Sequence, residues 1–197
     1  MRQRELIRAL VAIIVGLVIW VLLLLWLKPI ALASEAPQVD QIERALIWIV
    51  TEYQPNKRHP IARRPKWRRE LAGYIDLESE RRALPWPLVT AIIFRESSMR
   101  PSAKGDIGEV GLMQVADDLK RICKAQGLDL LKPHDQIKCG TWWLADRRDH
   151  CGDLKGAFAY YASGRVCKPD TNHLKDVVRD RFKLAERLEK ESAAGQK

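Results

Sequence analysis

Glu96 is the residue of this chain whose setting best suits the exchange of a proton with another molecule. Val89, Ile92, Ile93 and Met99 recur around it at helical spacing, so its side chain is expected to share their face. Apolar surroundings disfavour the charged form of a carboxylate, which is how a glutamate becomes a proton donor near neutral pH. The spacing therefore predicts a general acid near the end of a short helix.

Further short motifs follow Glu96 in a fixed order along the chain. They are Glu96-Ser97, then Gly111-Leu112-Met113-Gln114, then residues 131–140 (Leu-Lys-Pro-His-Asp-Gln-Ile-Lys-Cys-Gly), then Ala159-Tyr160-Tyr161-Ala162. The series resembles the soluble-type lytic transglycosylases, relatives of goose-type lysozyme. Their motifs are Glu-Ser, Gly-Leu-Met-Gln, Asp-Pro-x-x-Asn-Ile-x-x-Gly and Ala-Tyr-Asn-Ala-Gly. The resemblance covers about residues 67–168.

The resemblance implies cleavage of the β-1,4 bond after N-acetylmuramic acid in peptidoglycan. Glu96 would first protonate the glycosidic oxygen and then, as a base, take a proton from the muramoyl 6-hydroxyl that attacks C1. The product is a 1,6-anhydro sugar, and no water is consumed. One carboxylate is then enough, and the resemblance implies no metal and no cofactor.

The same resemblance supplies candidate substrate-binding residues. Gln114 matches the motif glutamine, which is expected near the sugar, and Tyr160 matches the tyrosine whose hydroxyl lies near the catalytic glutamate. Tyr161 replaces the motif asparagine and is expected to offer a stacking surface. Met113 is also a candidate substrate-binding residue, although a Leu-Met pair at the start of a helix usually packs in the hydrophobic core.

Departures from the motifs keep two alternatives open. Gly105 stands where the family often has serine, Glu109 where it has a small residue, and Ser163 at the motif glycine. A catalytically silent peptidoglycan-binding module is one alternative. A lysozyme-type muramidase is the other, and it needs a second carboxylate about 5–9.5 Å from the first. The candidates for that carboxylate are Asp106, Glu109, Asp117 and Asp118.

The N-terminal part of the chain has the pattern of a membrane segment. Residues 1–8 carry an excess of arginine, and residues 9–27 are an unbroken apolar run long enough to span a bilayer. The pattern predicts a single-pass inner-membrane protein with a cytoplasmic basic tail and a periplasmic catalytic domain. A cleaved signal with secretion to the periplasm is the alternative, because Ala31-Leu32-Ala33 fits a cleavage site.

The rest of the chain is expected to be mainly α, a lysozyme-like domain of several short helices preceded by the transmembrane helix. Residues 28–66 form a helical and basic connecting segment, 67–190 the transglycosylase domain and 191–197 a tail. Apolar residues at helical spacing predict the helices 39–53, 67–84, 87–101, 112–125, 135–148, 153–162 and 177–188.

Four cysteines in an exported chain suggest two disulfides. The residues are Cys123, Cys139, Cys151 and Cys167. Three pairings exist and the sequence does not choose among them. Cys123–Cys139 with Cys151–Cys167 is the pairing we favour, since each bond closes a short loop worth about 3 kcal/mol in the chain-entropy model.

The net charge of +9 is concentrated between residues 57 and 69, which carry seven basic side chains. Export argues against nucleic acid as the partner of this segment. An anionic membrane surface or cell-wall polymer suits it better, and a solvated basic linker is the alternative. The partners expected are peptidoglycan strands, the membrane through the N-terminal helix, and an envelope-spanning machine or a phage lysis or entry system.

Overall fold

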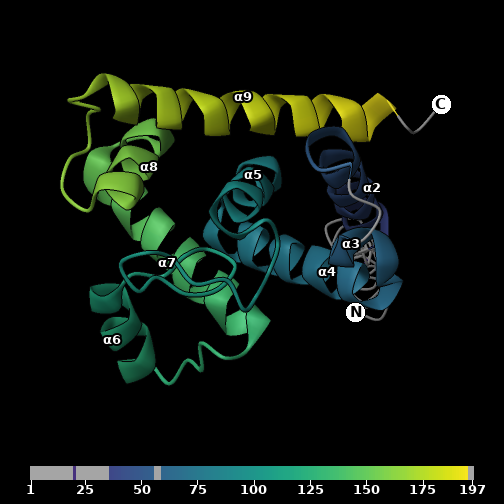
Figure 1. Ribbon diagram of the computed structural model, residues 1–197, viewed down its shortest axis with the longest axis horizontal. Helices are drawn as coiled ribbons and strands as arrows, with labels where there is room; N and C mark the ends of the chain where they lie inside the picture. Colours follow the sequence, from purple (N-terminus) through teal and green to yellow (C-terminus); the bar gives the residue numbers. More distant parts are fainter. Residues whose placement is uncertain (1–19, 21–35, 56–58, 195–197) are drawn as a thin grey trace, which may run out of the picture. The chain divides into compact units, whose positions relative to one another are not determined.

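The computed structural model describes residues 20, 36–55 and 59–194. The chain divides into two compact units, Met1–Ala36 and Pro37–Lys197, and the second contains every motif named above. The helices, labelled in Figure 1, are α2 (Ala36–Tyr53), α3 (Pro60–Arg63), α4 (Pro65–Arg82), α5 (Trp86–Ser97), α6 (Asp117–Ala125), α7 (Pro133–Cys151), α8 (Leu154–Ser163) and α9 (Asn172–Ala194). The prediction of a mainly α domain of several helices is confirmed, and the described residues form no β-strand beyond two isolated bridges.

Helix α5 lies inside a shell made by its neighbours. Helix α9 runs along one side of the unit over α5 and α8, and α7 packs on α8 and on α4 (Figure 1). One core links these helices, and it includes the fully buried Ile49, Leu71, Ile92, Phe158 and Leu188. The core therefore holds α5 from several sides, which fixes the helix that carries Glu96.

The boundaries of α5 follow from its sequence. Pro87 lies in the first turn, where its missing N–H costs nothing. The helix ends at Ser98, which adopts the left-handed conformation with φ 48° and donates its N–H to the carbonyl of Phe94. Residues 87–94 are buried throughout, and only the last turns bring polar side chains toward the surface. Glu96 thus lies at the point where the buried helix meets solvent.

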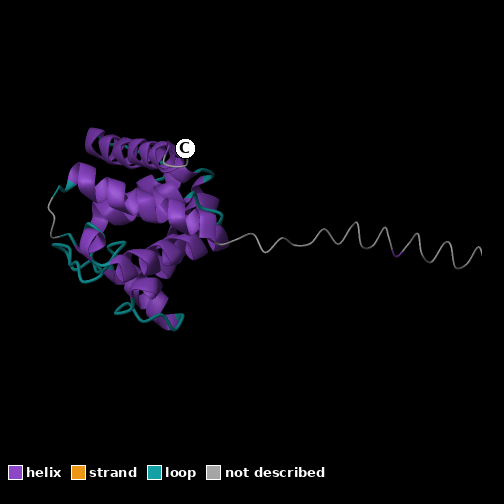
Figure 2. Ribbon diagram, turned by 90° about the vertical axis from the view of Figure 1, so that its right-hand side faces the viewer, coloured by secondary structure: helices purple, strands orange, loops and turns teal. Residues whose placement is uncertain are grey.

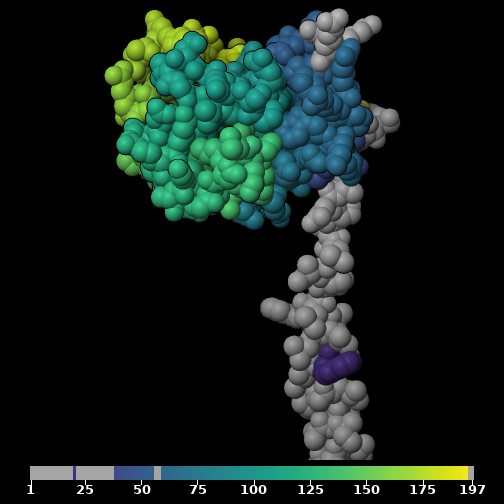
Figure 3. Space-filling model, turned by 60° about the horizontal axis from the view of Figure 1, so that its bottom comes forward, coloured from purple at the N-terminus to yellow at the C-terminus, as the bar shows by residue number. Residues whose placement is uncertain are grey.

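The connection between α5 and α6, residues 98–116, is the longest irregular stretch of the described chain (Figure 2). Figure 3 shows it in teal on one face of the unit, next to the green start of α7. We expected a helix from residue 112, but α6 begins at Asp117. Gly111 (φ 79°) and Gln114 (φ 46°) adopt left-handed conformations, which interrupt a right-handed helix. The Gly-Leu-Met-Gln motif therefore forms turns instead of a helix.

The predicted localisation requires correction. Among the residues that the structure describes, no helix is both long and apolar enough to cross a membrane, so a single-pass inner-membrane protein is not supported. The predicted anchor, residues 9–27, lies outside the described residues except for Trp20.

The favoured disulfide pairing is confirmed. Cys123–Cys139 joins α6 to α7, and Cys151–Cys167 joins the end of α7 to the connection before α9, with Cα–Cα distances of 5.9 and 5.4 Å. The sulfur atoms of Cys151 and Cys167 lie close to His150, but because they form a disulfide they are not available as metal ligands.

Part of the basic segment is neutralised inside the fold. Arg68 pairs with Glu43 at 3.1 Å, and Arg69 pairs with Asp40 at 2.9 Å and with Glu43 at 2.7 Å. These contacts fasten α4 to α2, a helix whose apolar side contributes to the common core. Two arginines of the segment therefore serve the packing of α2 against α4.

Candidate active site

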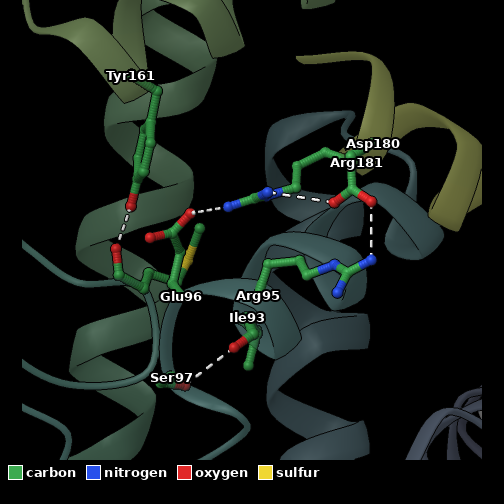
Figure 4. Close-up of polar contacts among 8 residues, drawn as sticks. Ile93, Arg95, Glu96, Ser97, Tyr161, Asp180 and Arg181 are labelled. Carbon is green, nitrogen blue, oxygen red and sulfur yellow. Dashed lines mark hydrogen bonds and ion pairs between the residues drawn. The ribbon is translucent and has the colours of Figure 1, made fainter. Parts of the chain in front are cut away.

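Glu96 is held at the end of α5 by an arginine from the far end of the chain. Its Oε1 accepts a hydrogen bond from Nη2 of Arg181 on α9 at 3.1 Å, and the two side chains are 24% and 15% exposed (Figure 4). The surroundings of Glu96 are therefore not purely apolar, in contrast to the prediction from helical spacing. An adjacent guanidinium favours the ionised form of a carboxylate.

Tyr161 of α8 completes the surroundings of Glu96. Its hydroxyl donates to the backbone carbonyl of Met113. Glu96 lies beside Tyr161 (Figure 4). Burial, followed by the nearby Glu96 carboxylate, raises the pKa of Tyr161 far above its ordinary value. The phenol thus remains protonated and acts as a hydrogen-bond donor. It connects the Gly-Leu-Met-Gln turn to the helix that carries the last motif.

Tyr160 lies in a different place from the one we expected. Its ring contacts Trp143 and His150 of α7 at centroid distances of 6.2 and 5.8 Å, and the guanidinium of Arg147 lies 4.8 Å from its centre. Tyr161 has the position that the motif tyrosine was predicted to have. A shift of the motif by one residue also aligns its glycine with Gly164, which caps α8 with φ 74°.

Met113 contributes its backbone rather than its side chain. The side chain is fully buried, and its sulfur packs against α7 at Gly140, where a Cβ atom would come within 2.6 Å of Sδ. This close approach requires glycine at position 140. The Met113 carbonyl is thereby fixed as the acceptor for Tyr161.

Gln114 uses its side-chain amide to hold its own loop. Nε2 donates to the carbonyl of Gly111 at 2.9 Å and to that of Ala103 at 3.4 Å. The Ala103 carbonyl also accepts from the N–H of Gly111 at 2.9 Å. The motif glutamine therefore stabilises the connection 98–116 through hydrogen bonds to its backbone.

Gln136 also holds the backbone of the connection 98–116 through hydrogen bonds, and the sequence analysis gave this residue no role. Its side chain is buried, accepts from the N–H of Leu112 at 2.8 Å, and donates to the carbonyls of Pro101 and Leu130 at 2.9 and 2.8 Å. It occupies the asparagine position of the Asp-Pro-x-x-Asn-Ile-x-x-Gly motif, which was the available signal. Arg181 was also missed, because it lies among alternating charges in the last helix and outside every motif.

A cavity of about 450 Å³ borders this braced connection. Its wall is mainly apolar and includes Pro101, Ala103, Val110, Leu130 and Gln136. Glu96 is not part of its lining.

The comparisons with known proteins agree with this architecture. The family described as "Transglycosylase SLT domain" matches residues 73–178, more than half of the chain. A search of curated proteins gives no match. Among solved structures, an inactive mutant of the lytic transglycosylase Slt from Pseudomonas aeruginosa is similar, with a TM-score of 0.55 and 18% identity over 75% of this chain.

The aligned region is 28% of that longer chain, and at this identity the likeness concerns the fold. Family membership rests on the matched segment 73–178, which contains Glu96, the Gly-Leu-Met-Gln turn and Tyr161. The resemblance seen in the order of the motifs is thus confirmed. The chain belongs to the transglycosylase SLT domain family.

Proposed function

We propose that this protein is a peptidoglycan lytic transglycosylase that cleaves the β-1,4 bond between N-acetylmuramic acid and N-acetylglucosamine. The observation that carries the proposal is the position of Glu96, a partly exposed carboxylate at the end of a buried helix within the matched family segment. We assign the catalytic domain to residues 67–190, a range that includes this segment.

Glu96 carries out two proton transfers in the proposed reaction. As an acid it protonates the glycosidic oxygen, so that the bond from this oxygen to C1 of the muramoyl sugar breaks. As a base it then takes the proton of the muramoyl 6-hydroxyl while that oxygen bonds to C1. Glu96 ends as it began, and a 1,6-anhydro sugar leaves without the uptake of water.

The second carboxylates that a hydrolase would need are engaged or exposed in this fold. Glu109 accepts the N–H of Ile107 in its own turn. Asp117 and Asp118 lie on the surface of α6 and pair with Lys120 and Arg121 of the same helix. Asp106 is exposed as well. These contacts favour a mechanism with one carboxylate over the muramidase alternative.

The remaining candidate residues support the reaction in different ways. Tyr161 is a donor next to Glu96, and Met113 and Gln114 shape the turn to which the Tyr161 hydroxyl is bonded. Tyr160, the preceding residue of α8, contacts α7, where its partly exposed ring is available to a longer glycan strand. We propose local opening of the wall as the role of this protein, for an envelope-spanning machine or a phage lysis or entry system.

Digestion of purified sacculi tests the proposal. The parent protein should release muropeptides that are one water lighter than reducing-end products, as shown by mass spectrometry. Glu96→Gln should reduce release at least about 100-fold, because it removes the acid and base. Glu80→Gln, at an exposed position on α4, is the matched control and should behave as the parent.

Each alternative gives a different result in this assay. Products with reducing ends and no anhydro sugar would identify a muramidase. Binding of parent and Glu96→Gln to sacculi without release of products would identify a silent wall-binding module.

A further inference from the structure

Two adjacent residues of α5 pair with two adjacent residues of α9. Arg95 donates to Oδ1 of Asp180 at 2.8 Å, and Arg181 donates to Glu96 at 3.1 Å. Within α9, Nη1 of Arg181 also donates to Oδ2 of Asp180 at 3.2 Å. The four side chains thus form one continuous ion network that joins the candidate acid to the last helix (Figure 4).

Arg181 is fixed in this network by its surroundings. Its guanidinium lies 5.8 Å from the ring centre of Phe158, a fully buried residue of α8, and its side chain is only 15% exposed. Nε is buried without a hydrogen-bond partner among the described atoms. The contacts of Arg181 to two carboxylates therefore hold it in place, although one of its donors has no partner.

The other end of the network is anchored as well. Arg95 lies 5.2 Å from the ring centre of Tyr53 on α2, which holds it beside Asp180. Asp180 therefore pairs with two arginines, Arg95 and Arg181, and the contact with Arg95 keeps its carboxylate beside Arg181. Arg181 consequently has two carboxylate partners at nearly equal distances, Glu96 and Asp180.

We propose that Arg181 is a positioning residue that holds the Glu96 carboxyl group in both of its protonation states. The inference rests on the proposed function, since it concerns the acid and base steps. When Glu96 is ionised, Arg181 pairs with it. When Glu96 is protonated, the charge of Arg181 is still compensated by Asp180, so the guanidinium stays in place for the next ionised state.

The groups that face Glu96 set the sign of the pH effect. They are Arg181 of α9 and the neutral hydroxyl of Tyr161 on α8, with Arg95 and Asp180 in the next layer. Arg181 is the cation in direct contact with the Glu96 carboxylate, at 3.1 Å. Removal of this adjacent positive charge should extend activity that depends on a general acid to higher pH.

The pH dependence of kcat/KM for release of anhydro-muropeptides, combined with the carbon-13 chemical shift of the Glu96 carboxyl group, tests the inference. In Arg181→Gln we expect the alkaline limb of the profile to move to higher pH, because the cation beside the carboxyl group is removed. We expect kcat to fall about tenfold, since the acid is less well oriented. Arg181→Lys keeps the positive charge, so the alkaline limb of its kcat/KM profile should lie at nearly the same pH as in the parent.

Two further variants complete the design. Arg179→Gln is the matched control, because Arg179 is an exposed arginine of α9 that pairs with Asp176 of its own helix. Asp180→Asn removes the second partner of Arg181 and should move the limb in the opposite direction, to lower pH. This variant keeps the test decisive if Arg181→Gln does not fold.

The outcomes separate the inference from the proposed function. If Arg181→Gln and Asp180→Asn both titrate as Arg179→Gln does, Arg181 has only a structural role and the inference is wrong, even if the protein releases anhydro-muropeptides. If the parent releases no product, the proposed function fails, and the carboxyl titration still decides whether Arg181 controls Glu96.

Discussion

The carboxylate of Glu109 fills the space beside the Cα atom of Gly105. A Cβ atom at position 105 would lie 2.3 Å from Oε2 of Glu109 and 2.7 Å from Oε1 of Gln114. Two departures from the family motifs, the missing serine and the added charge, therefore compensate each other. The pair keeps the connection 98–116 closed around the motif glutamine.

This relationship predicts energetic coupling between the two positions. Gly105→Ala should lower the free energy of unfolding by about 1 kcal/mol, because Glu109 must move and loses its contact with the N–H of Ile107. In a Glu109→Ala background the same change should lower the free energy of unfolding clearly less. Part of the loss should remain, because the new Cβ atom still contacts Gln114. Urea denaturation of the two single variants and the double variant measures the coupling, and strict additivity would contradict the compensation.

The two neighbouring tyrosines of α8 should respond differently to loss of the hydroxyl group. Tyr161→Phe leaves the Met113 carbonyl without its donor and should cost about 1–3 kcal/mol of unfolding free energy. It should also reduce the release of muropeptides, because the Gly-Leu-Met-Gln turn loses its link to α8. Tyr160→Phe is the control, since its ring contacts with α7 do not require the hydroxyl. Equal losses of stability and of muropeptide release in the two variants would contradict the alignment of the motif tyrosine with Tyr161.

Much of this site could be predicted from the sequence because its main signals are local. The apolar spacing around Glu96 and the flanking prolines predict a short buried helix, and α5 has these properties. The cysteine spacing favoured the pairing that is found. Short-range patterns of this kind depend on backbone geometry, which the sequence dictates directly.

The parts that were missed depend on contacts between distant segments. Arg181 lies 85 positions after Glu96 in the chain, and nothing in its own helix distinguishes it from the other arginines there. A tandem Tyr160-Tyr161 leaves the alignment of a motif open by one residue, and on a helix that shift turns a side chain by about 100°. The left-handed conformation of Gln114 is likewise imposed by its loop.

The glycine of the Gly-Leu-Met-Gln motif should tolerate substitution far less than a glycine of the same conformation elsewhere. Gly111 (φ 79°) and Gly127 (φ 80°) share a left-handed backbone, so alanine costs about 1 kcal/mol at either position for conformation alone. A Cβ atom at Gly111 would also lie 2.3 Å from Cδ of the buried Gln136, whereas none of the atoms described lies within 4 Å at Gly127. Gly111→Ala should therefore cost about 1–3 kcal/mol more than Gly127→Ala.

Chemical denaturation of the two glycine variants measures this difference. Release of muropeptides should fall for Gly111→Ala and stay at the parent value for Gly127→Ala. Equal losses of stability would mean that the contact with Gln136 does not constrain the motif.

His59 should make the stability of the protein depend on pH below neutrality. It is nearly buried, its Nδ1 accepts the N–H of Ile61 at 3.2 Å, and its Nε2 lies 3.1 Å from the carbonyl of Ser98, the residue that ends α5. Burial lowers the pKa of His59 below 6.5, the repulsion of Arg100 adds to this effect, and the hydrogen bond to Ser98 opposes it. The folded state thus prefers the neutral ring, with Nδ1 as acceptor and Nε2–H as donor.

The sign of the effect follows from the lowered pKa. The stabilising contribution of His59 is fully present above pH 6.5, where the unfolded chain also has a neutral ring. It is lost as the pH falls below 6.5 toward the folded pKa, because the unfolded state binds the proton first. Free energies of unfolding at pH 8, 7, 6 and 5 should fall less steeply below pH 6.5 in His59→Asn than in the parent. His150→Asn, at an exposed position of α7, should keep the slope of the parent, and equal slopes in all three proteins would rule out His59 as the source.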